Sequence, residues 1–327
     1  MTEQELADKI KAGDRRALAR GITLVESRRE DHRRAAEKLL DRLLPKTGKS
    51  IRLGISGPPG VGKSTFIEAF GQYLIENGHK VAVLAIDPSS KISGGSILGD
   101  KTRMTELSRR KEAYIRPSPA GETVGGVARR TREALLLCEA AGFDVVIVET
   151  VGVGQSETAV AEMTDMFLLL LGPGGGDDLQ GVKRGVMELA DLLIVNKADG
   201  DLAAAAERAA SDYAHALRLM HALHADWQPS VVKCSALKSE GMAVVWDKVR
   251  SFRKATTKNG ELESRRRDQA KNWLWQEVSE GLLDRLKSDS DLAASLAKLE
   301  AKVAQRRTSP SAAARSLLSS FFKGLAD

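Results

Sequence analysis

Residues 57–65 read GPPGVGKST and decide the fold of this 327-residue chain. They fill the phosphate-loop pattern G-x-x-x-x-G-K-[ST], including Lys63 and Ser64. An apolar run over 51–56 precedes the pattern and a helical pattern over 66–77 follows it. Glycines let the backbone point several N–H groups at a phosphate, and the positive end of the helix dipole meets the same anion. The sequence therefore predicts a nucleoside triphosphate site within a strand–loop–helix unit.

Two side chains of this loop have separate expected roles. Lys63 bridges the outer phosphates as a catalytic charge, and the Ser64 hydroxyl completes a Mg2+ shell that keeps most of its water. The nucleotide contacts predicted in this loop are Gly60, Val61, Gly62, Lys63, Ser64 and Thr65.

The base is read further along the chain. A strand pattern over 191–195 is followed by Asn196-Lys197-Ala198-Asp199, the N-K-x-D pattern of GTPases. The Asp199 carboxylate accepts two hydrogen bonds from guanine, whereas adenine would leave it unpaired at roughly 2–5 kcal/mol. We expect Lys197 to pack along the base and Asn196 to tie this loop to the phosphate loop. The pattern predicts GTP and GDP as ligands, held here by Asn196, Lys197 and Asp199.

A second loop favours the same base. The strand pattern over 230–234 is followed by Ser235-Ala236-Leu237, which resembles the S-A-K/L loop whose backbone N–H contacts the guanine carbonyl. Ser235, Ala236 and Leu237 therefore join the predicted nucleotide contacts. Three such motifs in order along one chain are hard to obtain by chance.

A polar segment after the next strand is a candidate switch. The strand pattern over 80–86 ends at Asp87, and the Gly- and Ser-rich stretch that follows contains Asp100 and Arg103. A long polar loop beyond a strand's carboxyl end can close on Mg2+ and the γ-phosphate. We predict catalytic roles for Asp87, Asp100 and Arg103, with both aspartates in the metal shell; a turn cap is the alternative for Asp87.

The strand pattern over 143–148 leads into Glu149-Thr150-Val151-Gly152, in the place of the usual D-x-x-G. Glu149 is predicted to hold a magnesium-bound or attacking water, and the Gly152 N–H to contact the γ-phosphate. Val153 stands where Ras-like GTPases keep the glutamine that orients the attacking water. Because valine makes no hydrogen bond, we expect slow intrinsic hydrolysis that a partner protein stimulates.

A third candidate switch covers 173–183, PGGGDDLQGVK. Three consecutive glycines maximise backbone freedom, and Asp177, Asp178, Gln180 and Lys183 offer polar groups for alternate pairings. A simple structural connector is the alternative.

Composition indicates a globular protein, with 42% hydrophobic and 29% charged residues. The first residues are charged and have no apolar signal core, and no apolar run approaches the roughly 20 residues of a membrane span. Two isolated cysteines, Cys138 and Cys234, argue for a reducing compartment. We expect a cytoplasmic protein with no membrane contact, and Cys138 as a core residue.

The net charge of +6 does not indicate nucleic-acid binding. The basic clusters are interleaved with acidic residues, aromatic residues make up only 4% of the chain, and solvated helix faces explain the clusters. These clusters are Arg28-Arg29, Arg33-Arg34, Arg109 to Lys111 and Arg265 to Arg267. His221 and His224 share a helix face, but no acidic or cysteine partner is near them in sequence, so no histidine metal site is predicted.

The middle of the chain alternates strands and helices, which predicts an α/β fold with a doubly wound, mostly parallel sheet and the nucleotide at the carboxyl ends of the strands. The expected strands are 51–56, 80–86, 143–148, 166–171, 191–195 and 230–234, with another near 113–116. The expected helices are 64–77, 122–141, 181–189, 202–224 and 241–258. We divide the chain into an N-terminal helical extension (1–44), a phosphate-loop GTPase domain (45–260) and a C-terminal helical arm (261–327).

Several longer stretches resemble the MeaB/ArgK family within the G3E group of phosphate-loop GTPases. They include DPSSKISGGSILGDKTRM, RPSPAGETVGGVARRTREA, ETVGVGQSE, DDLQGVKRGVMELADLLIVNKADGD and CSALKSEG. The early stretch KIKAGDRRALARGITLVES matches as well, so the resemblance covers essentially the whole chain.

This resemblance implies a homodimeric GTPase chaperone of adenosylcobalamin-dependent methylmalonyl-CoA mutase. In such proteins GTP binding and hydrolysis gate cofactor delivery and protect the mutase from inactivation; a cobalamin adenosyltransferase is a second candidate partner. The family pattern implies three switch loops, at about 88–105, 150–162 and 174–185, and dimerisation through the terminal helices.

Two other functions remain open from the sequence. A metallochaperone GTPase for nickel enzymes shares the core but normally carries a Cys/His cluster. A nucleotide-dependent kinase linked to arginine/ornithine transport is the older name of some relatives, and the N-K-A-D motif argues against its use of ATP.

Overall fold

The computed structural model describes residues 1–27, 29–87, 104–119, 124–150, 156–174, 184–220, 223–288 and 290–323. The predicted site residues Asp100, Arg103 and Gly152 lie outside these ranges, as do residues 88–103, 151–155 and 175–183 of the three predicted switch loops. The chain divides into two compact units, Met1–Gln269 and Ala270–Asp327.

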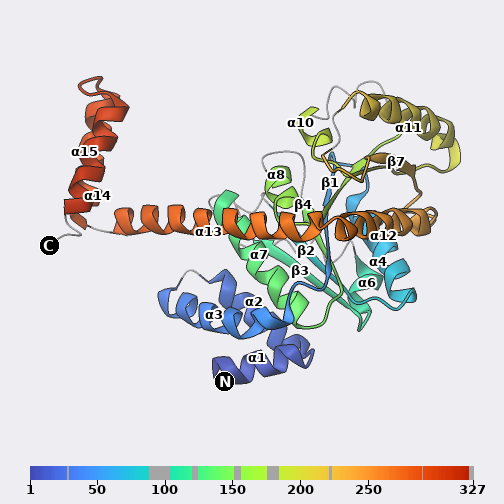
Figure 1. The fold of residues 1–327 in the computed structure, drawn as a ribbon, viewed down its shortest axis with the longest axis horizontal. Helices are drawn as coiled ribbons and strands as arrows, with labels where there is room; N and C mark the ends of the chain where they lie inside the picture. Colours follow the sequence, from blue (N-terminus) through green and yellow to red (C-terminus); the bar gives the residue numbers. More distant parts are fainter. Residues whose placement is uncertain are drawn as a thin grey trace. The chain divides into compact units, whose positions relative to one another are not determined.

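A parallel sheet of seven strands forms the centre of the first unit (Figure 1). The strands lie in the order β3-β2-β4-β1-β5-β6-β7. Its strands are rich in Val, Ile and Leu because both faces of the sheet are covered. The strands are β1 (Ile51–Ser56), β2 (Val81–Asp87), β3 (Ala113–Pro119), β4 (Val145–Thr150), β5 (Met166–Leu171), β6 (Leu192–Val195) and β7 (Ser230–Lys233).

Helices cover both faces of this sheet, and successive strand residues point to opposite cores. Leu53 and Ile55 of β1 belong to the core under α4 (Lys63–Glu76), α6 (Thr105–Arg109) and α12 (Met242–Lys258). The other core lies under α7 (Val124–Ala140), α8 (Ser156–Ala161), α10 (Arg184–Met187) and α11 (Ala203–Arg218), the last preceded by the 3-10 turn η3 (Gly200–Leu202).

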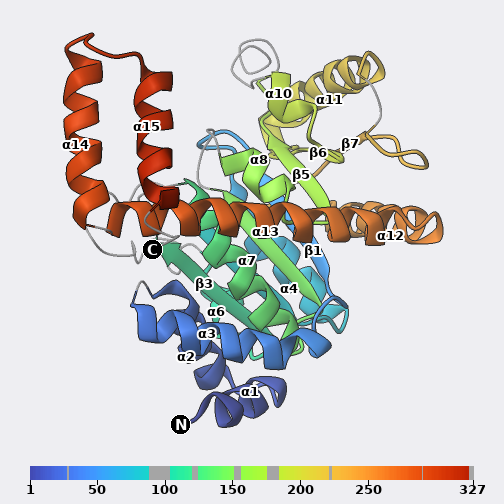
Figure 2. The same ribbon diagram turned by 60° about the vertical axis from the view of Figure 1, so that its left-hand side comes forward.

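The N-terminal helices add a layer outside α7 (Figure 2). They are α1 (Glu3–Lys11), α2 (Arg15–Glu26) and α3 (Glu30–Leu43), followed by the 3-10 turn η1 (Leu44–Lys46). Thr2 and Glu5 form a capping box on α1, and Asp14 caps α2. Leu18, Ile22 and their neighbours are buried in the same core as α7.

Helix α13 (Glu261–Ser288) begins in the first unit and continues into the second. The second unit also contains α14 (Ser290–Ala304) and α15 (Pro310–Lys323), which pack side by side. In this unit Leu317 and Phe321 are buried, whereas Trp275 is 69% exposed. Apolar side chains on α13 thus remain uncovered within the chain.

The predicted fold class is confirmed, and the sheet is parallel throughout its named strands. The predicted carboxyl ends of two strands are wrong. Strand β2 continues through Asp87, and β4 continues through Glu149 and Thr150. These polar residues continue the ladder because Glu149 pairs with Ile55 and Ala85 of the flanking strands. The division into 1–44, 45–260 and 261–327 stays a prediction.

Two helices end earlier than predicted. The helix expected over 202–224 ends at Arg218, because His224 and Trp227 contact the start of β6 and so leave the helical path. The helix expected over 181–189 ends at Met187, and its first three residues lie outside the described ranges.

The interpretation of every basic cluster as a solvated helix face is wrong for Arg265 and Arg266. Arg266 donates to Asp165 and to the carbonyl oxygens of Gly48 and Ser50. Arg265 donates to the Ala161 carbonyl. These guanidinium groups fasten the start of α13 to the first unit.

Within the described ranges, no helix is both long enough and apolar enough to cross a membrane.

Candidate functional site

The phosphate loop leaves β1 through two positions that only glycine suits. Gly57 has φ 157°, and a Cβ there would lie 2.3 Å from the Leu170 carbonyl oxygen. Gly62 has φ 93°, and a Cβ there would lie 2.8 Å from Asn196 Nδ2. A side chain at either position would push the loop away from β5 or from the base-reading loop.

Lys63, the first residue of α4, folds back over its own loop. Its Nζ donates to the Gly57 carbonyl at 2.6 Å and to the Pro58 carbonyl at 3.2 Å. Burial lowers the pKa of Lys63, while the carboxylates of Glu149 and Glu157 act in the opposite direction. The ammonium therefore lies among two carbonyls and two nearby carboxylates, at the place where phosphate oxygens are expected.

Two predicted metal ligands meet at the start of α4. The Ser64 hydroxyl lies 3.5 Å from Glu149 Oε1, and Glu149 is only 3% exposed. Next to Glu149, the Thr150 hydroxyl donates to Ser56 Oγ at 2.7 Å, so the ends of β4 and β1 are joined. A hydroxyl and a carboxylate are hard oxygen donors, so the pair fits Mg2+.

Asn196 connects three segments of the site. Its Nδ2 donates to the Val61 carbonyl of the phosphate loop at 3.0 Å. Its Oδ1 accepts from the Ala236 backbone N–H at 3.0 Å and from the Cys234 thiol at 3.5 Å. The expected tie between the base-reading and phosphate loops is therefore present.

Lys197 adds a second tie, since its Nζ donates to the Gly60 carbonyl at 2.8 Å. Its φ of 61° is unusual for a residue with a side chain. Asp199 is half-buried and Leu237 is 81% exposed. The side chains of Asp199 and Leu237 are therefore accessible to a base. Asn196 and Ser235 are buried and hold the loops in place.

The structure brings most predicted site residues to one edge of the sheet. Contacts join the phosphate loop with Glu149 and with the loops at Asn196 and Ala236. Asp87 lies at the carboxyl end of β2, its side chain outside the described atoms. Asp100, Arg103 and Gly152 stay predictions.

Sequence reasoning missed two residues near this site. Glu157, in the first turn of α8, is 1% exposed and influences Lys63 electrostatically. Cys234 was given no role in the site, yet its thiol donates to Asn196 Oδ1 at 3.5 Å. An acidic residue soon after the E-x-x-G motif was the available signal for Glu157.

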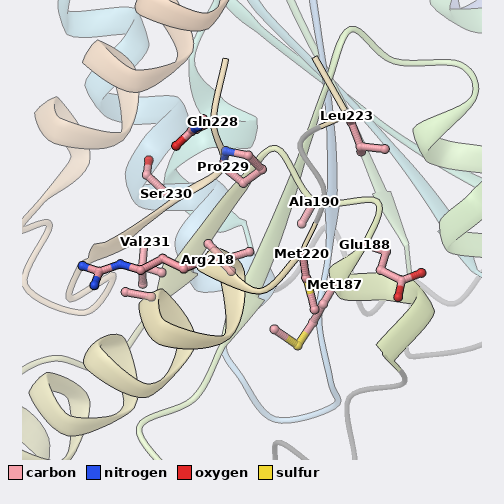
Figure 3. Close-up of a pocket in the computed structure, with 12 residues that line it drawn as sticks. Met187, Glu188, Ala190, Arg218, Met220, Leu223, Gln228, Pro229, Ser230 and Val231 are labelled. Atoms are coloured by element: carbon pink, nitrogen blue, oxygen red, sulfur yellow. The ribbon is translucent and has the colours of Figure 1, made fainter. Parts of the chain in front are cut away.

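A cavity of about 420 Å³ lies elsewhere (Figure 3). Its lining includes Ala190, just before β6, and Pro229 and Ser230 at the start of β7. These are the amino ends of the strands, whereas the nucleotide motifs follow the carboxyl ends. The cavity is therefore separate from the nucleotide site. Over the part of the chain that the structure describes, no three His, Cys, Asp or Glu side chains gather as a metal site.

The family model described as methylmalonyl Co-A mutase-associated GTPase MeaB matches residues 18–291. The chain belongs to the MeaB family. It is 57% identical to a putative GTPase of Caulobacter vibrioides over 97% of each chain. It is 48% identical to the mitochondrial methylmalonic aciduria type A homolog of Mus musculus, covering 98% of this chain and 80% of that one.

Among solved structures, the MeaB-family chain resembles a crystal structure of LAO/AO transport system kinase. The TM-score is 0.78 at 40% identity, covering 98% of this chain and 97% of the other. Family and relatives are named GTPases, and the loops that would hold guanine are joined as the motifs require. This MeaB-family chain is a GTPase that binds guanine nucleotides.

Proposed function

We propose that this GTPase is a chaperone of adenosylcobalamin-dependent methylmalonyl-CoA mutase, which gates cofactor loading and protects the mutase from inactivation. The observation that carries this proposal is the Asn196 junction between the phosphate loop and the base-reading loops, in a chain of the mutase-associated family. The name of the mouse relative, which refers to methylmalonic aciduria, supports the same client.

Ser64 and Glu149 would hold Mg2+, directly or through water, with Asp87 and Asp100 completing the shell. Bound Mg2+ supplies positive charge to the phosphate oxygens as the terminal bond breaks. Lys63 adds the second positive charge, which requires its ammonium to turn from the Gly57 and Pro58 carbonyls to the phosphates. Asp100, Arg103 and the Gly152 N–H are proposed to complete the γ-phosphate site.

Intrinsic hydrolysis should be slow. Val153 cannot orient water, so Glu149 is the described side chain best placed to hold the attacking water near Ser64. We propose that contact with the mutase reorganises the loops at 88–105, 150–162 and 174–185 and raises the rate.

The oligomeric state proposed is a homodimer formed through the C-terminal arm. On α13, Leu274, Trp275, Val278 and Leu282 are all at least 40% exposed. They recur at three- and four-residue spacing, so they form an apolar stripe that a second copy would cover. A cobalamin adenosyltransferase is the second proposed partner.

The proposed location is the cytoplasm. Cys138 and Cys234 are buried and form no disulfide, which agrees with a reducing compartment.

A nucleotide-dependent kinase linked to arginine/ornithine transport is the second candidate, because the similar crystal structure carries a transport-kinase name. The two functions differ in the fate of the γ-phosphate. Incubation with γ-labelled GTP and basic amino acids or their binding proteins should release inorganic phosphate alone. Labelled protein or amino acid would favour the kinase.

The mutase role is tested by GTP turnover with and without purified methylmalonyl-CoA mutase. We expect stimulation of several-fold or more. Asp177→Ala, Gln180→Ala and Lys183→Ala should each leave GDP affinity and intrinsic GTP turnover unchanged. Each should reduce the stimulation by the mutase and the GTP-dependent loading of its cofactor. No stimulation of the unmodified protein would contradict the mutase role, whereas full stimulation of all three variants would leave the third loop a connector.

A further inference from the structure

We propose that the cavity at the amino ends of β6 and β7 binds a small carboxylic acid with an aliphatic tail. Apolar side chains cover the tail of such a ligand, and Arg218 binds its carboxylate. The site is distinct from the nucleotide site, and its occupation requires neither the C-terminal arm nor the mutase.

Three segments of the first unit form this cavity. They are the end of α10 with the residues that follow it, the last turns of α11, and the residues that lead into β7. The volume of about 420 Å³ lies within the range of small-molecule pockets, roughly 300–1,000 Å³. All of the lining residues belong to the unit Met1–Gln269, so the cavity does not depend on where the second unit lies.

Most of the wall is apolar. Ala214 and Leu217 lie on the face of α11 that also carries Arg218, since residues three and four apart share a face of a helix. Met187 and Met220 add unbranched thioether side chains, which can adapt their shape to a bound aliphatic tail. Met187 is only 4% exposed and belongs to the core between the sheet and α11. The wall therefore offers a tail of this kind a cover from water.

Arg218 supplies the charge that a ligand meets. It is the exposed last residue of α11, and within the described part of the chain its side chain makes no hydrogen bond or ion pair. Glu188, the other charged residue of the lining, has an interaction of its own within the chain. It lies on the opposite side of the cavity from Arg218 (Figure 3). A guanidinium offers two parallel N–H donors to one carboxylate, so an uncompensated arginine beside an apolar wall favours a monoanion with an apolar body.

Methyl NMR of the full chain bound to GDP tests the site, with octanoate as the probe. The chain has seven methionines, and the signals of Met187 and Met220 can be assigned from Met187→Leu and Met220→Leu. Both signals should shift saturably, with a dissociation constant of about 1 mM. The signals of Met104 and Met242, which are buried in the other core, should stay in place. Butanoate has a shorter tail and should bind at least about tenfold more weakly.

The role of charge is tested separately from the shape of the cavity. Octylamine carries a positive head on the same kind of tail, so it should bind about fivefold or more weakly than octanoate. Arg218→Gln should lower the affinity for octanoate by about threefold or more and narrow the difference between the two probes. Arg208→Gln is the matched control, because Arg208 is exposed on the same helix and is not part of the lining. It should leave both affinities unchanged.

A variant that fills the cavity tests its location. Ala214→Leu should abolish octanoate binding, while the affinity for GDP stays within about twofold because the nucleotide motifs follow the opposite ends of the strands. The GDP affinity also shows that this variant is folded. The absence of a saturable shift at Met187 and Met220 up to about 10 mM octanoate would overturn the proposal. Equal affinity of the unmodified protein for octylamine and octanoate, or undiminished octanoate binding by Ala214→Leu, would overturn it as well.

Discussion

Arg266 holds Asp165 in a two-point ion pair, with Nε to Oδ1 and Nη2 to Oδ2 both at 2.7 Å. Asp165 also accepts from the Arg52 N–H of β1, and Arg266 donates to the Ser50 carbonyl. One guanidinium thus joins the start of α13 to the beginnings of β1 and β5. The geometry explains why the first turns of α13 belong to the same compact unit as the sheet.

Removal of this guanidinium should be severely destabilising. The side chains of Arg266 and Asp165 are 17% and 6% exposed, so Arg266→Ala leaves a buried carboxylate without its counter-charge. We expect a loss of about 3 kcal/mol in the free energy of unfolding. Denaturant titration with GDP absent measures it, and Arg267→Ala should stay within about 0.5 kcal/mol of the unmodified protein. Equal stability of the two variants would show that the pair contributes little.

Stability should also depend on the protonation of His224. Burial acts to lower its pKa, but the hydrogen bond and charge of Asp191 and the hydrogen bond of Glu261 outweigh burial and the charge of Arg265, and raise it. A raised folded-state pKa gives stability that is fully present below the unfolded value, near 6.5, and is lost as pH rises through the folded value.

In the unmodified protein, the midpoint of urea unfolding should therefore fall as pH rises from the unfolded value, near 6.5, through the raised folded-state pKa of His224. The fall should be smaller in His224→Gln, which cannot gain the second proton. Ser108, a half-buried residue of α6 whose side chain does not ionise, provides a control site, and Ser108→Ala should keep the full pH dependence. Identical pH profiles for His224→Gln and the unmodified protein would contradict a stabilising role of the imidazolium.

Lys63 and Glu149 should affect different steps. Lys63→Ala removes the charge that faces the outer phosphates, so affinity for a GTP analogue should fall about tenfold or more. Glu149→Ala should retain GDP binding but lose about 100-fold in single-turnover hydrolysis, as expected for a group that orients water or metal. Glu149→Gln keeps the size of the side chain but removes its negative charge, so comparison with Glu149→Ala shows which of the two hydrolysis requires. Unmodified turnover by Glu149→Ala would exclude that residue from catalysis.

The C-terminal arm should control oligomeric state. A chain ending at Gln269 keeps Arg265 and Arg266, whereas a chain ending at 260 loses both and should be less stable. The chain that ends at Gln269 should be a monomer by light scattering, because it lacks the apolar stripe around Trp275. It should still bind GDP. Trp275→Ser with Leu282→Ser in the full chain should weaken the dimer as well. An intact dimer in both would place the interface elsewhere.

The sheet and its nucleotide motifs were predictable from sequence because they are local. Continuous apolar runs mark strands buried on both faces, and the phosphate-loop spacing fixes a turn before a helix. The ends of β2 and β4 were missed because Asp87 and Glu149 are charged. A charged residue after an apolar run usually indicates that a buried strand has ended. Glu149 nevertheless continues the pairing of β4 with β2, and its side chain lies near Ser64.

The contacts of α13 and α8 could not be predicted, because their partners are distant in the chain. Arg266 lies 101 residues from Asp165 and 218 from Gly48, and on a helix pattern it looks like any solvated arginine. His224 had no acidic neighbour in sequence, yet it lies between Asp191 and Glu261. Only the packing of the start of α13 against the sheet brings these charges together.

Calorimetric titration of GDP against ADP tests most directly the claim that the loops joined by Asn196 form a guanine site. GDP should bind at least about 100-fold more tightly than ADP, because the Asp199 carboxylate has no matching donors on adenine. Asp199→Asn should shift the preference toward xanthosine diphosphate, whose ring offers the complementary acceptor. Comparable affinities for GDP and ADP in the unmodified protein would contradict the account.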